Sequence, residues 1–119
     1  MMENNRTKGN QGESLAADFL FKNDFKIIAR NFSSSTNFQG GEIDIIAKRG
    51  ETIHFIEVKS RQSDKFGLGR EAVTLAKQKI IRRLATLYLV QNGSCDTASC
   101  CFDVIEINSG AVEHFINCF

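Results

Sequence analysis

The chain has 119 residues and a formal net charge of +1, with 42% apolar and 24% charged residues. These values fit one globular domain with its own hydrophobic core, and no apolar run is long enough to span a membrane. The N-terminal sequence has no apolar signal segment, so we expect a cytoplasmic protein whose four cysteines are free thiols. We expect a single domain over residues 1–119, with residues 1–8 flexible.

Apolar residues at helical spacing predict a first helix over residues 10–23, where Asn10 and Glu13 have the spacing of a capping box. A second helix is predicted over residues 70–91. Five strands are predicted from β-rich or alternating segments: 25–31, 42–48, 52–59, 102–108 and 111–118. The second and third strands are expected to form one antiparallel hairpin, and the fourth and fifth another. The order α-β-β-β-α-β-β predicts a mixed α/β fold with helices packed on a central sheet.

The small net charge hides an uneven distribution along the chain. Residues 48–83 carry +6, whereas residues 1–47 carry −1 and residues 84–119 carry −4. A basic middle third is typical of a surface that binds a polyanion, and a solvated helix face is the alternative. The basic residues that we assign to nucleic-acid binding are Arg61, Lys65, Arg70, Lys77, Lys79, Arg82 and Arg83.

Two carboxylates and a lysine are expected to converge on the first hairpin. Asp44 lies six residues before the turn glycine Gly50, and Glu57 lies seven residues after it. An antiparallel pair then brings both carboxylates to the same end of the hairpin, within about one residue pair. Lys59 is two residues from Glu57 and therefore shares its face of the strand.

Two neighbouring carboxylates repel each other unless a cation neutralises them. Mg²⁺ or Mn²⁺ would suit Asp44 and Glu57, with the Val58 carbonyl as a third protein oxygen. Lys59 would then orient a water molecule or stabilise charge on a phosphate, which predicts metal-assisted hydrolysis of a phosphodiester. The alternative is an ion pair of Lys59 with one of the two carboxylates and a purely structural role.

Several motifs resemble the YraN-like family of small bacterial proteins, over about residues 9–107. They are GEIDIIA (41–47), FIEVKSR (55–61), FDV (102–104), Gly12-Glu13 and Arg30-Asn31. That family is grouped with the restriction-endonuclease-like PD-(D/E)XK superfamily and is similar to Holliday-junction resolvases. The resemblance implies a restriction-endonuclease-like mixed β-sheet flanked by helices. It also implies that Asp44, Glu57 and Lys59 form the nuclease signature.

The same resemblance implies that Glu13 is an accessory acid, although a capping role for Glu13 is an equal alternative. It also implies that Lys77 or Gln78 lies near the site, and we include Gln78 among the nucleic-acid-binding residues. The family usually has arginine where this chain has Cys101, so any role of that arginine is lost.

The leading hypothesis is an endonuclease that uses Mg²⁺ or Mn²⁺ to cleave DNA, branched structures included, and that could act as a homodimer. The alternative is a catalytically silent module that binds nucleic acid or a protein partner. The cysteines lack the spacing of a zinc site, and His54 and His114 are interpreted as packing or hydrogen-bonded residues.

Overall fold

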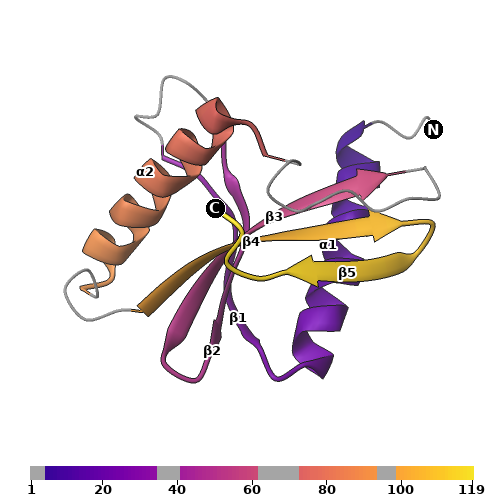
Figure 1. Cartoon of the computed structure of the whole chain (residues 1–119), viewed down its shortest axis with the longest axis horizontal. Coiled ribbons are helices and arrows are strands. Elements are labelled where there is room, and N and C mark those ends of the chain that lie inside the picture. The colour runs from indigo at the N-terminus through magenta and orange to yellow at the C-terminus, as the bar shows by residue number, and fades with distance from the viewer. Residues whose placement is uncertain (1–4, 35–40, 62–72, 94–98) are drawn as a thin grey trace.

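The computed structural model describes residues 5–34, 41–61, 73–93 and 99–119. The elements in chain order are α1 (Asn5–Lys22), β1 (Lys26–Phe32), β2 (Ile43–Arg49), β3 (Thr52–Arg61), α2 (Leu75–Gln91), β4 (Ser99–Asn108) and β5 (Ala111–Phe115). The predicted order and the mixed α/β class are therefore confirmed (Figure 1). No helix in the described part of the chain has the length and apolar character needed to cross a membrane.

The five strands form one sheet in the order β1-β2-β3-β4-β5. Strands β3 and β4 are parallel, whereas the other neighbouring pairs are antiparallel. A parallel pair needs a long crossover connection, and α2 lies in the segment that joins β3 to β4.

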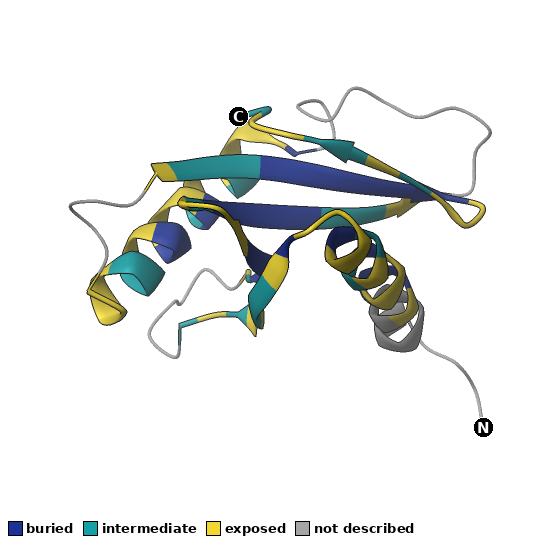
Figure 2. Cartoon of the chain, turned by 90° about the horizontal axis from the view of Figure 1, so that it is seen from below, coloured by how far each residue is buried: buried dark blue, intermediate teal, exposed yellow. Residues whose placement is uncertain are grey.

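The two helices cover opposite faces of the sheet (Figure 1). Strand β4 shows the alternation clearly, because Val104 belongs to the core cluster with α2 and Ile105 to the cluster with α1. Phe55 and Ile56 on β3 divide in the same way. The central strands are buried along most of their length (Figure 2), and a charged side chain placed there must find a partner.

The β2–β3 hairpin has the expected register. Ile45 pairs with Ile56, and the turn contains Gly50 at φ +60°. Continuing this register by one residue places Asp44 opposite Glu57, as the count from the turn predicts. The second hairpin turns at Ser109 and Gly110, which both have positive φ, as tight two-residue hairpin turns require.

Both helix starts differ from the prediction. Helix α1 begins at Asn5, so Asn10 and Glu13 lie inside the helix and the predicted capping box is wrong. Residues 5–9 hold no apolar side chain, and apolar periodicity detects only a helical segment that packs on a core. Helix α2 begins at Leu75 because Thr74 is extended and its hydroxyl accepts the Lys77 N–H at 3.1 Å. Residues 70–72 lie outside the described residues, and the helix end at Gln91 is confirmed.

Replacing Gly41 with alanine is expected to destabilise the fold by about 1–3 kcal/mol. Gly41 has φ +93°, and an added Cβ would lie 2.8 Å from Cγ2 of Ile80 on α2. Gly50→Ala is the matched control, because Gly50 has φ +60° but nothing within 4 Å of the added Cβ. Urea unfolding should show the larger loss for Gly41→Ala, and equal losses would contradict the close approach to α2.

Candidate functional site

Asp44 near the start of β2 and Glu57 on the neighbouring β3 form a buried carboxyl pair. Their relative exposures are 8% and 5%, and each carboxyl lies close enough to the other for their charges to interact. Asp44 Oδ2 also accepts the backbone N–H of Val58 at 2.8 Å. Burial and the neighbouring Glu57 carboxyl together raise the pKa of Asp44 from 3.8 to about 8, against the smaller lowering effect of the Val58 N–H. At neutral pH the metal-free pair therefore holds a proton that an exposed pair would lose.

The basic side chain beside this pair comes from α2. Lys77 Nζ lies 3.5 Å from Glu57 Oε2. That buried oxygen makes no hydrogen bond to the described residues, so the Lys77 ammonium is the charged group that faces it. Lys59 lies two residues beyond Glu57, half-buried, and forms no ion pair with another described residue. The resemblance placed Lys77 near the site, and the structure shows it in contact with Glu57.

A second acidic group adjoins Asp44. One carboxylate oxygen each from Glu13, Glu42 and Asp44 lies within 4.8 Å of the others. The Asn31 amide bridges two of these acids, donating to Glu13 Oε1 at 2.9 Å and to Glu42 Oε1 at 3.1 Å. Burial raises the pKa of Glu13 against the opposing effect of this amide. Of the two alternatives for Glu13, the structure excludes the cap and places the side chain beside Asp44.

Glu42 and Asn31 were not among the predicted site residues. Glu42 lies two residues before Asp44 and directly precedes β2, so its nearness in the sequence was a signal for including it. Asn31 adopts φ +53°, a left-handed conformation that asparagine tolerates better than most residues. Only the folded chain brings Asn31 of β1 between α1 and β2.

The donor atoms at Asp44 and Glu57 fit a hard divalent cation. The site offers carboxylate oxygens, and the Val58 carbonyl follows Glu57 directly along β3; oxygens of both kinds are ligands that Mg²⁺ and Mn²⁺ prefer. Within the described residues the buried Glu57 Oε2 accepts no hydrogen bond, and a cation bound here would displace the proton that the raised pKa of Asp44 retains. The residues present are therefore compatible with a metal bound by Asp44, Glu57 and Val58.

The predicted nucleic-acid-binding residues of α2 separate into two groups. Lys79 and Arg83 are exposed. Arg82 is exposed as well, but its guanidinium also lies 4.7 Å from the centroid of the Phe102 ring. Gln78 Nε2 donates to the Val73 carbonyl at 3.1 Å, so this side chain is engaged within the protein. Lys65, Arg70 and the side chain of Arg61 lie outside the described residues.

The sequence matches known proteins over most of its length. Residues 12–107 match the family model described as "Uncharacterised protein family UPF0102". A UPF0102 protein of Symbiobacterium thermophilum is 46% identical over 105 residues, which cover 88% of this chain and 85% of the relative. A UPF0102 protein of Geobacter metallireducens is 42% identical, covering 100% of this chain and 97% of the relative. These matches confirm the resemblance to the YraN-like family, and the chain belongs to the uncharacterised protein family UPF0102.

Proposed function

We propose that this protein is an endonuclease that hydrolyses phosphodiester bonds in DNA, branched structures included, with Mg²⁺ or Mn²⁺. The observation that carries the proposal is the buried contact between the carboxyl groups of Asp44 and Glu57. Such a contact opposes folding in the metal-free protein at neutral pH, because one carboxyl must stay protonated. A bound cation would neutralise both carboxylates, so the repulsion that destabilises the metal-free fold would instead favour cation binding.

The surrounding residues support a role in phosphate chemistry. The Val58 N–H fixes Asp44, and Lys77 pairs with Glu57, so both carboxylates are held in place. A bound cation would neutralise phosphate charge and lower the pKa of a water molecule. Lys59, on the same strand face as Glu57, is then available to stabilise negative charge on the phosphate. Glu13, held by Asn31, adds a carboxylate that can accept a proton beside Asp44.

The exposed basic residues of α2 would contact the phosphate backbone. Lys79 and Arg83 lie four residues apart and so project from one face of the helix. Such contacts carry no sequence information, which suits an enzyme that recognises the shape of DNA.

A catalytically silent module is the second candidate, and the ion pair between Lys77 and Glu57 favours it. An ammonium group 3.5 Å from Glu57 Oε2 already supplies positive charge where a cation would bind. Salt-dependent DNA binding without turnover would support this candidate. A protein adaptor would bind neither DNA nor RNA at low salt.

Cleavage assays on linear, flapped and four-way DNA decide between these candidates. Wild-type protein should cleave at least one substrate with Mg²⁺ or Mn²⁺ and lose the activity in chelator. The Asp44→Ala and Glu57→Ala variants should be inactive. Cleavage that is the same in wild type and both variants would contradict the proposed nuclease.

Replacing both Lys79 and Arg83 with glutamine is expected to weaken DNA binding and to flatten its salt dependence. Each lost phosphate contact should reduce the slope of log K against log salt concentration by about 1. The matched control is Lys22→Gln, an exposed lysine at the end of α1. Fluorescence anisotropy across a salt series measures the slopes, and a double variant with the wild-type slope would exclude these residues from the interface.

A further inference from the structure

A second cluster of titratable side chains lies on the face of the sheet that α1 covers. His54 of β3, Asp103 of β4 and His114 of β5 form it, and each side chain is at most 6% exposed. Asp103 Oδ2 lies 2.6 Å from His54 Nδ1 and 2.8 Å from His114 Nε2. These three atoms lie within 4.8 Å of one another. Glu57 points to the opposite face, so the cluster is separate from the carboxyl pair.

The cluster is enclosed and held in position by its neighbours. The Phe25 ring lies 4.9 Å from the His54 ring and 5.5 Å from the His114 ring, between centroids. The backbone N–H of Asn117 donates to Asp103 Oδ1 at 2.9 Å, which leaves Oδ2 for the two imidazoles. Burial disfavours the charged form of Asp103, but the hydrogen bonds from both histidines and Asn117 outweigh it and hold the pKa below its ordinary value. Asp103 is therefore an ionised carboxylate at neutral pH.

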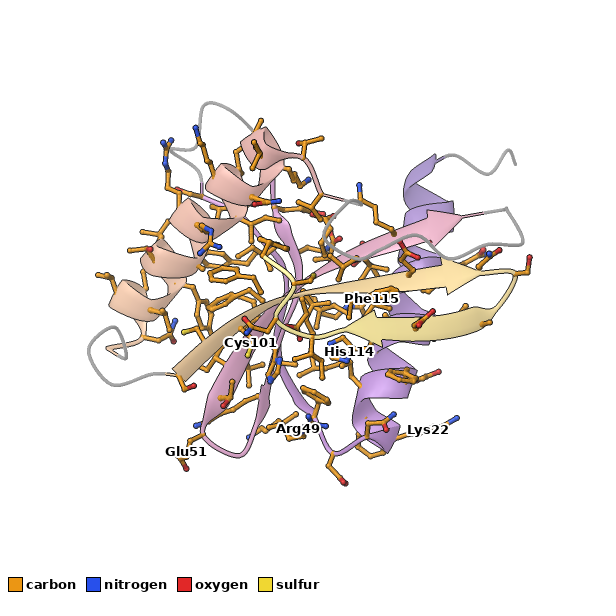
Figure 3. All side chains as sticks on the ribbon, in the orientation of Figure 1. Lys22, Arg49, Glu51, Cys101, His114 and Phe115 are labelled. Atoms are coloured by element: carbon orange, nitrogen blue, oxygen red, sulfur yellow. The ribbon has the colours of Figure 1, made fainter. Side chains whose placement is uncertain are left out.

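A thiol lies on the same face of the sheet, although its sulfur is not one of the atoms that lie within 4.8 Å of one another. Cys101 is the register partner of His54 across the parallel β3–β4 pair, and it shares a face with Asp103 two residues further along β4. Burial raises the pKa of the Cys101 thiol, and the charge of Asp103 raises it further. Figure 3 labels Cys101 of β4 and His114 of β5.

We propose that His54, Asp103 and His114 form a binding site for Zn²⁺ or a similar transition-metal ion, with Cys101 as the fourth ligand. Two imidazoles and a thiolate select Zn²⁺ over Mg²⁺, which prefers oxygen ligands. Four protein ligands make a closed site, the type that has a structural role. The ion would join β3 and β4 to the edge strand β5.

Metal binding requires small and specific changes in the cluster. Tetrahedral bonds of about 2.0–2.1 Å separate nitrogen and oxygen ligands by about 3.3 Å. The His54 nitrogen must therefore move about 0.7 Å and the His114 nitrogen about 0.5 Å from Asp103 Oδ2, starting from 2.6 and 2.8 Å. The Cys101 side chain must also turn so that its sulfur joins these atoms. The protons that now bridge to Asp103 move to the other ring nitrogens or to solvent, and the Cys101 thiol releases its proton to solvent.

Titration of the metal-free, untagged protein tests the site. Calorimetry with Zn²⁺ should give one equivalent, and Co²⁺ should give the visible absorption of a tetrahedral site with a thiolate charge-transfer band. His114→Gln should weaken Zn²⁺ binding at least 10-fold. His114 lies on the edge strand, and circular dichroism checks that the variant folds. Cys101→Ser should lose the thiolate band while it still binds Co²⁺, which keeps the test decisive if His114→Gln does not fold.

Two controls separate this site from other metal ligands. Cys118→Ser removes a different thiol, and Asp44→Asn alters the carboxyl pair, so both should bind Zn²⁺ like the wild type. The proposal is overturned if the wild type binds no equivalent of Zn²⁺ or if folded His114→Gln binds it equally well. It is also overturned if Cys101→Ser keeps the thiolate band or if Asp44→Asn no longer binds one equivalent of Zn²⁺.

Discussion

Replacing Glu57 with glutamine is expected to reduce Mg²⁺-dependent DNA cleavage by at least about 100-fold. Loss of a group that only supports a metal ligand typically lowers metal affinity or activity by about 10–100-fold, and loss of the ligand itself should lower activity more. Glutamine keeps the volume of this buried side chain but removes the charge that attracts a hard cation. Initial rates on the best substrate of the DNA panel measure the effect.

Glu51→Gln is the matched control for this prediction. Glu51 lies in the turn of the same hairpin and is exposed, so its replacement should leave cleavage unchanged. DNA binding measured in chelator should be retained by Glu57→Gln, because the exposed basic residues of α2 are unaltered. Wild-type cleavage rates in folded Glu57→Gln would show that the carboxyl pair has no catalytic role.

Asp44→Asn is expected to stabilise the metal-free protein at pH 8 by roughly 2–4 kcal/mol, the size that a shift of a few pKa units represents. The pKa of Asp44 is raised from 3.8 to about 8, so the folded protein binds a proton that the unfolded chain has released across this range. Wild-type stability therefore falls as pH rises from about 4 to about 8. Asparagine does not titrate, and its side-chain oxygen can still accept the Val58 N–H.

Denaturant unfolding at several pH values in chelator measures this difference. The free energy of unfolding of Asp44→Asn should depend less on pH than that of the wild type. Asp18→Asn, an exposed acid on α1, should follow the wild-type curve. Saturating Mg²⁺ should stabilise the wild type at pH 8 and have little effect on Asp44→Asn. Parallel pH profiles for wild type and Asp44→Asn would contradict the raised pKa.

The contact between Asp44 and Glu57 could be predicted because it depends on local rules. Side chains alternate along a strand, and a glycine turn sets the register, so counting from Gly50 places the two carboxyls together. The mixed class of the fold followed from the element order for a similar reason. Both inferences need only the periodicity of segments that are close in sequence.

The remaining contacts depend on how distant elements pack. Lys77 contacts Glu57 only because α2 packs against the sheet, and Asn31 reaches Glu13 only because β1 lies beside α1. The cluster around Asp103 joins side chains from three strands, so no spacing within the sequence indicates it. The N-terminal extension of α1 was missed because residues 5–9 carry no apolar pattern.

A crystal of the protein soaked in Mn²⁺ tests most directly whether Asp44 and Glu57 share a catalytic cation. We predict an anomalous peak about 2.0–2.6 Å from carboxylate oxygens of both residues, the range for hard cations with oxygen ligands. The Val58 carbonyl should lie in the same coordination sphere, and the peak should disappear in Asp44→Asn. Mn²⁺ found only at exposed carboxylates, with no peak between Asp44 and Glu57, would contradict the proposed metal site.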